Sequence, residues 1–576
     1  MHWKNFVPIL DWLPKYKNKQ FRGDIAAGLT VGVMLIPQGM AYAMIAGLPP
    51  IYGLYASTIP LILYAILGTS RQLAVGPVAM VSLLTAAGIG AMAEAGTEAY
   101  ITLAILLALL VGAIQFLLGA FRLGFLVNFL SHPVISGFTS AAALIIGLSQ
   151  LKHLLGVDLA RSHHVHEIII QAVEQVNNIN WVTVLIGVAG IFVIKGVKRI
   201  NPAIPGPLSA VLFGILAVWI FGLTEMGVKI VGEVPKGLPS LTIPQFNAEQ
   251  IQTLIPIALA IALVSFMESI AVAKAIQTKH KNYKVEPNQE LIALGLANIG
   301  GAFFQSYPTT GGFSRTAVND QTGAKTGMAS IFSAVLIILT LLFLTPLFYF
   351  LPKAILASVI MVAVFGLIDY KEAIHLWHSN RSDFMMLIVT FIATLALGIE
   401  QGIGIGVILS LVMVIYRTTR PHTAELGRIP GSEHYRNVDR FSNLEIRPEL
   451  LIFRFDAQLY FANVQHFKDS LEEMVAEKGK GLNAILINAA SINGLDSSAA
   501  HALEEVVEHY AAQGIKTYFS GVRGPVRDAL TKAHLIDKIG NQNFFMNVEQ
   551  AVRHIEQDGK LRSNGVYRDY TLQTND

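Results

Sequence analysis

The stretch Gly311-Gly312-Phe313-Ser314-Arg315-Thr316 interrupts a series of long apolar segments with two glycines, two hydroxyl side chains and one arginine. An earlier interruption is Gly76-Pro77. Each break is followed by a segment too short to cross a bilayer alone, Pro77–Ala91 and Ser314–Ala324. Inside a membrane, non-helical backbone is tolerated only where it is buried in protein or lines a cavity. If the flanking segments span a membrane, both breaks therefore belong to the interior of a helical bundle.

The composition indicates a membrane location for most of the chain. Of 576 residues, 53% are hydrophobic and 14% are charged, whereas soluble domains carry about 25% charged residues. The apolar segments end near Arg417, and the remaining sequence is typical of a soluble protein. We expect a cytosolic segment over residues 1–22, a transmembrane domain over residues 23–420 and a cytosolic domain with a C-terminal tail over residues 421–576.

Charge and residue types exclude several classes of function. The net charge of +3 is too small to indicate a nucleic-acid partner, and the chain has no cysteine for disulfides or Cys-ligated metals. We find no Walker motif, and no Ser-His-Asp or paired-carboxylate set can be assembled. We therefore expect no enzyme activity, no catalytic residue, no cofactor and no metal site.

About fourteen segments before Arg417 are candidate membrane spans. The clearest ones are Ile25–Ile45, Ile101–Leu118, Val182–Ile194, Leu208–Phe221, Leu254–Ala273, Ile331–Phe348 and Ile403–Ile415. Basic loop residues fall mainly on the side of the N-terminal segment, which predicts that both termini are cytosolic. The N-terminal segment shows no signal-peptide pattern. We expect an integral protein of a bacterial inner membrane.

The two breaks occupy corresponding places in two halves of the chain, which is typical of a transporter's binding site. One lies in the third predicted span and the other about seven spans later, so we expect two inverted repeats of seven spans. A helix that begins at each break would present free N–H groups and a partial positive charge, at Val78 and Ala79 and at Phe313 and Ser314. Arg315 adds a full positive charge, so the pattern indicates an anion site. The alternative is that the glycines only let helices pack closely.

Three further polar residues lie in the first and eighth predicted spans. Gln38 and Tyr42 could donate hydrogen bonds to an oxyanion. Glu268 is the one carboxylate in the apolar run Ile255–Ala273, where an ionised acid is costly, and an acid of this kind is a candidate carrier of a coupled proton. The alternatives for Glu268 are a structural hydrogen bond, an ion pair with Arg315 or Lys274, and direct contact with the substrate.

Three separated motifs resemble the sulfate permease (SulP) family of anion transporters. They are Pro37-Gln38-Gly39-Met40-Ala41-Tyr42-Ala43, the stretch from Glu286-Pro287-Asn288-Gln289-Glu290-Leu291 to Asn298-Ile299-Gly300-Gly301, and Gly312-Phe313-Ser314-Arg315-Thr316-Ala317-Val318-Asn319. The resemblance implies a helical 7+7 inverted repeat with core and gate domains, a homodimer, and movement of the core like an elevator. Members with glutamate at the place of Glu268 include proton-coupled importers, which favours symport.

The C-terminal region resembles STAS domains. Alternating strands and helices, with strands at Leu450–Phe455, Ala484–Asn488 and Ile515–Ser520, predict an α/β domain. The segment Asn493-Gly494-Leu495-Asp496-Ser497-Ser498-Ala499 resembles a loop whose serine can be phosphorylated, so Ser497 is a candidate regulatory phosphosite. Ala499 and Asn488 depart from the family pattern, and Asp496-Ser497-Ser498 can alternatively be a helix N-cap.

The sequence therefore predicts a secondary active transporter that takes up sulfate together with protons. Bicarbonate, dicarboxylate or chloride transport on the same scaffold is the first alternative. A membrane-docked STAS module that binds a cytosolic protein partner is a more distant one.

Overall fold

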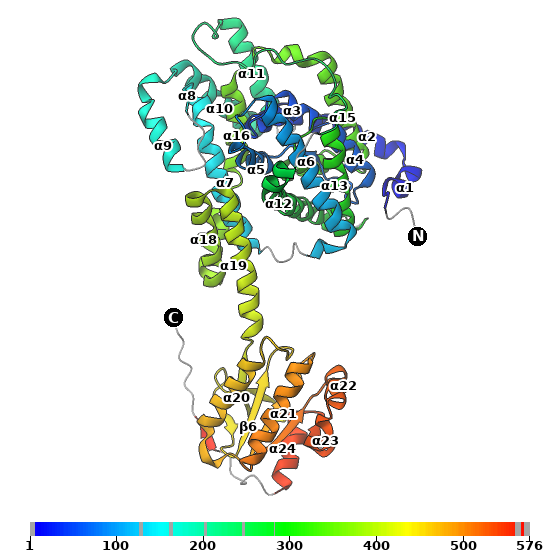
Figure 1. The fold of residues 1–576 in the computed structure, drawn as a ribbon, viewed down its shortest axis with the longest axis vertical. Helices are drawn as coiled ribbons and strands as arrows, with labels where there is room; N and C mark the ends of the chain where they lie inside the picture. The colour runs from blue at the N-terminus through cyan, green and yellow to red at the C-terminus, as the bar shows by residue number, and fades with distance from the viewer. Residues whose placement is uncertain are drawn as a thin grey trace. The chain divides into compact units, whose positions relative to one another are not determined.

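The computed structural model describes residues 6–125, 131–159, 165–200, 204–244, 248–280, 283–558 and 566–568 (Figure 1). The chain divides into two compact units, Met1–Leu411 and Val412–Asp576. The division falls within the helix α19 (Ile399–Thr419).

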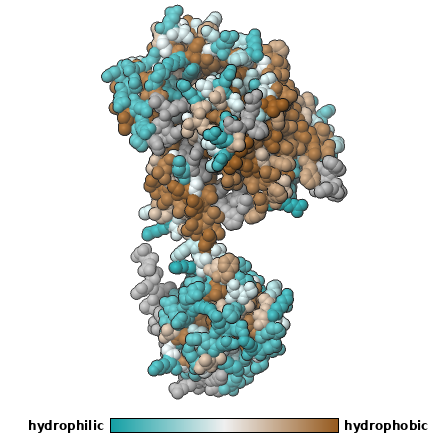
Figure 2. Space-filling model, viewed as in Figure 1, coloured by the Kyte–Doolittle hydropathy of each residue, from teal (hydrophilic) through white to brown (hydrophobic). Residues whose placement is uncertain are grey.

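The first unit is built from helices and contains one pair of two-residue strands. Its elements before α19 are α1 (Ile9–Trp12), α2 (Asn18–Ile45), α3 (Ile51–Tyr55), α4 (Ile59–Leu67), β1 (Val75–Gly76), α5 (Ala79–Gly90), α6 (Glu98–Ala120), α7 (His132–Ser149), α8 (Leu151–Leu155), α9 (Val165–Glu174), α10 (Trp181–Ile200), α11 (Gly206–Phe221), α12 (Ala248–His280), α13 (Pro287–Phe303), β2 (Thr310–Gly311), α14 (Phe313–Gln321), α15 (Met328–Leu339), α16 (Lys353–Phe365), α17 (Tyr370–Ser379) and α18 (Arg381–Leu397). Figure 2 shows apolar residues over much of the visible face of this unit.

Six of the helical ranges in the described part of the chain are long and apolar enough to cross a membrane. Shorter apolar helices accompany them, among them α11 and the stretch Ile51–Leu67 that contains α3 and α4. These ranges agree with a multi-pass helical fold. The count of fourteen spans stays a prediction, because several helices are too short to be assigned as spans by length alone.

Close helix packing holds the first unit together. Helix α6 packs along α13, and α2 packs along α15. A Cβ atom at Gly112 would lie 2.7 Å from the carbonyl oxygen of Gly295, so α6 and α13 approach each other at a distance that only glycine permits. Small residues at such crossings allow the close backbone contact that stabilises helix pairs in membranes.

The second unit is an α/β domain. Its strands are β3 (Thr423–Arg428), β4 (Tyr435–Asn437), β5 (Leu444–Ile446), β6 (Leu450–Phe455), β7 (Ala484–Asn488), β8 (Lys516–Ser520), β9 (Phe544–Phe545) and β10 (Val566–Arg568). Its helices are α20 (Val464–Lys478), α21 (Ser497–Ala512), α22 (Gly524–Lys532), α23 (Leu535–Ile539) and α24 (Val548–Gln557). The sheet order is β10-β5-β3-β6-β7-β8-β9, with β4 beside β3, and β6 to β9 run parallel.

The apolar run of β6 is explained by burial on both faces of the sheet, as is typical of parallel strands. Leu451 and Phe453 pack in the cluster that includes α20 and α21, whereas Leu450 and Ile452 pack in the cluster that includes α24. The predicted strands β6 and β7 are confirmed residue for residue, and β8 begins one residue later than predicted. The α/β class predicted for this region is confirmed.

Candidate binding site at two broken helices

The breaks at Gly76-Pro77 and at Gly311-Gly312 meet in space. Strand β1 pairs antiparallel with β2, with Val75 opposite Gly311 and Gly76 opposite Thr310. Helix α5 follows β1, and α14 follows β2. Because the strands run in opposite directions, the two helices leave the strand pair in opposite directions and their N-termini converge on it. The two short helices that the sequence predicts are therefore present.

Hydroxyl groups of α12 fix the strand pair in position. Ser269 accepts a hydrogen bond from the Gly311 N–H at 2.8 Å and lies 2.7 Å from the Thr310 hydroxyl. Thr310 in turn donates to the carbonyl oxygen of Ser265 at 2.7 Å. Buried polar groups of this kind must be paired, and each such bond contributes about 1 kcal/mol. These contacts place α12, the helix that carries Glu268, directly beside the strand pair.

A hydroxyl from α14 secures the opposite strand. Thr316 accepts a hydrogen bond from the Ala74 N–H at 3.0 Å, immediately before β1. Thr316 is completely buried, so its hydroxyl is used for structure.

The N-termini of α5 and α14 keep their free N–H groups. Neither helix has a side-chain N-cap among the described residues, and the cap positions are occupied by Val78 and Gly312. The first N–H groups of a helix have no intrahelical acceptor and carry a partial positive charge. Two such termini that converge from opposite sides offer N–H donors and partial positive charge of the kind that anions bind.

Arg315 lies in the first turn of α14 and is 2% exposed. Its Nη1 atom donates to the Pro77 carbonyl oxygen at 2.6 Å, so the guanidinium bridges to the residue that precedes the α5 N-terminus. Nε and Nη2 are buried and have no hydrogen-bond partner in the described part of the chain. Buried donors without acceptors are costly, and a guanidinium fits an oxyanion with two parallel hydrogen bonds. These two atoms are therefore available to a bound anion.

Three ionisable side chains surround the guanidinium of Arg315. Tyr42, Glu268 and Tyr307 each interact with it electrostatically. The Tyr307 hydroxyl lies 3.2 Å from the Ser82 hydroxyl of α5. Glu268 is partly buried and makes no side-chain hydrogen bond within the residues that the structure describes. The cluster thus holds one cation, one carboxylate and two phenols at the converging helix termini.

The other predicted site residues differ in how deeply they are buried. Gln38 and Tyr42 lie one turn apart on α2, at 5% and 6% exposure, and the Oε1 atom of Gln38 has no partner among the described residues. Val78 and Ala79 are buried at the start of α5. Phe313 is 62% exposed and Ser314 is also exposed, so their side chains do not share the buried surroundings of Arg315.

Sequence reasoning missed Tyr307, Ser82 and Ser265. The available signal for Tyr307 was its place in Ser306-Tyr307-Pro308, directly before the broken helix. Ser82 and Ser265 could not be singled out from the sequence, because hydroxyl residues are common in membrane helices that bind no ligand.

Ser497 lies in the second unit, where it is the exposed first residue of α21. The preceding Asp496 accepts hydrogen bonds from the N–H of Ala499 at 2.8 Å and from the N–H of Phe461 at 2.9 Å. Asp496 is therefore the N-cap of α21, the alternative considered for this segment. Phosphorylation of Ser497 stays a prediction.

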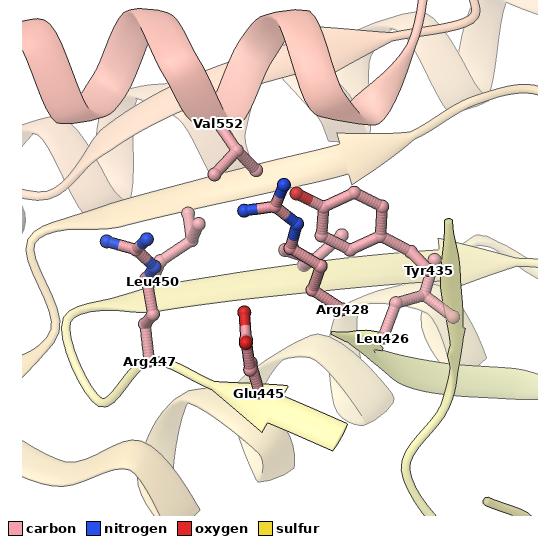
Figure 3. Close-up of a pocket in the computed structure, with 8 residues that line it drawn as sticks. Leu426, Arg428, Tyr435, Glu445, Arg447, Leu450 and Val552 are labelled. Atoms are coloured by element: carbon pink, nitrogen blue, oxygen red, sulfur yellow. The ribbon is translucent and has the colours of Figure 1, made fainter. Parts of the chain in front are cut away.

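A pocket in the second unit also contains arginines (Figure 3). The guanidinium of Arg428 lies beside the ring of Tyr435, and Arg447 lies on the other side of the Glu445 carboxylate. Arg428 donates to the Ser432 carbonyl oxygen at 2.7 Å and approaches Glu549 at 3.4 Å. Arg447 is paired with Glu556. Because carboxylates already neutralise both cations, this pocket is not a second anion site.

Both parts of the chain match families of known proteins. Residues 21–390 match the model of the sulfate permease family, and residues 442–551 match that of the STAS domain. This chain belongs to the sulfate permease family. It is a multi-pass membrane transporter with a C-terminal STAS domain, and not an enzyme.

Relatives and solved structures agree with this assignment. The chain is 39% identical over 564 residues to "Sulfate transporter 4.1, chloroplastic" of Arabidopsis thaliana, covering 95% of this chain and 82% of the relative. The murine Solute Carrier 26 family member A9 anion transporter, solved in the inward-facing state, matches with a TM-score of 0.88 and 25% identity over 96% of this chain and 94% of the other. The transmembrane domain of a cyanobacterium bicarbonate transporter shares the fold at a TM-score of 0.59 and 22% identity, over 69% and 98% of the two chains.

Proposed function

We propose that this member of the sulfate permease family moves sulfate across a membrane as a secondary active transporter. The observation that carries the proposal is the buried guanidinium of Arg315, with two unpaired nitrogen atoms at the converging N-termini of α5 and α14. Sulfate offers several acceptor oxygens to such donors. The name of the Arabidopsis relative supports sulfate as the substrate.

In the proposed site, Arg315 and the N-termini at Val78–Ala79 and Phe313–Ser314 bind the anion. For the exposed Phe313 and Ser314, the contact would come from backbone N–H groups. Gln38 and Tyr42 on α2 would close the opposite side with amide and hydroxyl donors.

We also propose that Glu268 carries a coupled proton. A carboxylate that is partly buried and receives no hydrogen bond from the described residues loses little by taking up a proton. Ionised Glu268 would attract Arg315 and compete with the anion, whereas neutral Glu268 leaves the guanidinium to the substrate. Anion and proton would then bind together, which is symport.

The topology follows from the loop charges. We propose cytosolic termini, a transmembrane domain over residues 23–420 between a cytosolic segment of residues 1–22 and a cytosolic domain of residues 421–576, a homodimer, and a bacterial inner membrane as the location. The cytosolic termini rest on the distribution of basic residues, and the homodimer rests on the family resemblance.

Other small anions also fit the proposed site. A site made of N–H donors and one cation selects charge and approximate size, so bicarbonate also fits, as do chloride and small dicarboxylates. The fold shared with a bicarbonate transporter is compatible with this alternative.

Uptake of labelled sulfate into proteoliposomes under an inward proton gradient tests both parts of the proposal. We expect accumulation above the equilibrium level that collapses when a protonophore removes the gradient. Bicarbonate, chloride and fumarate serve as competitors. If one of these is accumulated and sulfate is not, sulfate is the wrong substrate. Sulfate accumulation that does not depend on the proton gradient would overturn the proposed role of Glu268.

A further inference from the structure

Helix α17 exposes an apolar stripe that the first unit leaves uncovered. The helix joins α16 to α18 and has the sequence Tyr-Lys-Glu-Ala-Ile-His-Leu-Trp-His-Ser. Tyr370, Ile374 and Trp377 are 63%, 56% and 53% exposed. Their spacing of four and three residues puts them on one face of the helix. Leu376, on another side, is buried against the unit.

A basic stripe runs beside the apolar one. Lys371, His375 and His378 follow the same spacing one residue later, and all three are exposed. The single acidic residue of the helix, Glu372, lies 3.3 Å from His132. This side of α17 therefore presents one lysine and two imidazoles that can donate hydrogen bonds to anions, and Asp369 caps the first turn of the helix.

Arg381 at the start of α18 extends this basic surface. Its guanidinium lies over the Trp377 ring at 5.9 Å, and Trp377 packs edge-on against Phe384 at 5.0 Å. A cation held against an aromatic ring is typical of the zone between lipid headgroups and acyl chains, where tryptophan and tyrosine also gather.

Two adjacent stripes of this kind, one apolar and one basic, match a helix that lies in the plane of a membrane surface. Both neighbours of α17 are apolar helices of a membrane protein, so the helix ends are held close to the bilayer. We propose that α17 rests on the membrane surface, with Tyr370, Ile374 and Trp377 inserted among the lipids. Lys371, His375, His378 and Arg381 then bind the phosphate groups of anionic phospholipids.

Helix α9 provides an internal contrast. It also exposes apolar side chains, with Ile169, Ile170 and Val173 at 45%, 54% and 66%. Its sequence contains two glutamates, Glu167 and Glu174, one histidine, His166, and neither lysine nor arginine. By its charge, α9 should not attract anionic lipid. Trp181, which is 73% exposed at the start of α10, can report on the lipid near it.

Tryptophan quenching by brominated lipids tests the proposal in the full-length chain. The chain has five tryptophans, and two variants keep either Trp377 or Trp181 while the other four are changed to phenylalanine. Each variant is reconstituted in mixed phosphatidylglycerol and phosphatidylcholine vesicles, with bromine on one lipid or on the other. The ratio of the two quenching values reports the lipid composition around each tryptophan.

We expect phosphatidylglycerol around Trp377 to exceed its share of the bulk lipid several-fold, since each surface lysine or arginine contributes about five-fold in binding. Around Trp181 the composition should equal the bulk. Lys371→Gln with Arg381→Gln in the Trp377 variant should return its ratio to the bulk value. Because each ratio is taken within one protein, a change in the brightness of Trp377 cancels.

Bulk composition around Trp377 would overturn the proposal. Absence of quenching by either lipid would also overturn it, because a protein surface such as a second copy would then cover the stripe. If the single-tryptophan variants do not fold, native mass spectrometry of the unmodified chain and of Lys371→Gln/Arg381→Gln counts retained phosphatidylglycerol. Equal retention by the two proteins would contradict the proposal.

Discussion

Glu290 and Glu268 are both removed from most of the solvent in the first unit, yet their surroundings are opposite. Glu290 on α13 is completely buried and accepts hydrogen bonds from the Tyr64 hydroxyl at 2.6 Å, the Thr69 N–H at 2.7 Å, the Thr69 hydroxyl at 2.6 Å and the Ser70 N–H at 3.1 Å. Glu268 on α12 receives no side-chain hydrogen bond from the described residues, and its electrostatic partner is Arg315.

The difference distinguishes a carboxylate with a structural role from one that is a candidate for function. Four donors satisfy the Glu290 carboxylate, so this side chain ties the end of α4 to α13. Glu268 and the Nε and Nη2 atoms of Arg315 have no hydrogen-bond partner among the described residues, and such groups are tolerated where a ligand or a proton completes them. Four variants test this contrast.

Glu290→Ala should destabilise the first unit by about 3 kcal/mol, because it removes the acceptor of four donors of Tyr64, Thr69 and Ser70 that are buried or partly buried. Thermal unfolding in detergent measures this loss. Exposed Glu249→Ala is the matched control and should leave the unfolding temperature unchanged. If Glu290→Ala unfolds at the same temperature as the control, the hydrogen bonds to Glu290 do not stabilise the first unit.

Arg315→Gln should weaken sulfate binding about 10- to 100-fold, the range expected for lost hydrogen bonds to a charged group. Equilibrium titration with the anion measures it, and exposed Arg199→Gln serves as the control. Unchanged affinity would remove Arg315 from the site.

Glu549→Gln tests the same contrast in the second unit. Glu549, like Glu290, is a buried carboxylate that accepts several hydrogen bonds. Burial raises the pKa of Glu549, but hydrogen bonds from Tyr435 and Arg553 and the charge of Arg428 outweigh it, so the net pKa is lowered. The stability from a lowered carboxyl pKa is present above the unfolded value and is lost as the pH falls through the folded value. Calorimetry of Glu549→Gln should therefore show a free energy of unfolding that is about 1 kcal/mol lower at pH 7, and this difference should become smaller in acid. A loss that is independent of pH would contradict this explanation.

Tyr307→Phe should reduce sulfate affinity by only a few-fold, since it removes one hydroxyl and its contact with Ser82. Tyr349→Phe, at an exposed position, is the control. If Tyr307→Phe abolishes binding, the hydroxyl contacts the anion directly and the proposed site is incomplete.

The sequence predicted those parts of the molecule whose residue types are unusual for their place. Glycine and proline breaks in apolar segments predicted α5 and α14, and single charges in apolar runs singled out Arg315 and Glu268. The antiparallel pairing of β1 with β2 could not be predicted, because it joins two-residue strands more than 200 positions apart. Strands β4 and β5 have only three residues each and carry polar side chains, so the sequence pattern gave no signal for them.

Glu268, which no described residue hydrogen-bonds, is proposed to carry the coupled proton. The direct measurement compares Glu268→Gln with the unmodified chain in proteoliposomes, for sulfate accumulation driven by a proton gradient and for sulfate counterflow without a gradient. Glutamine mimics the protonated acid, so accumulation should be lost while counterflow persists. Gradient-driven accumulation by Glu268→Gln at the unmodified rate would contradict it.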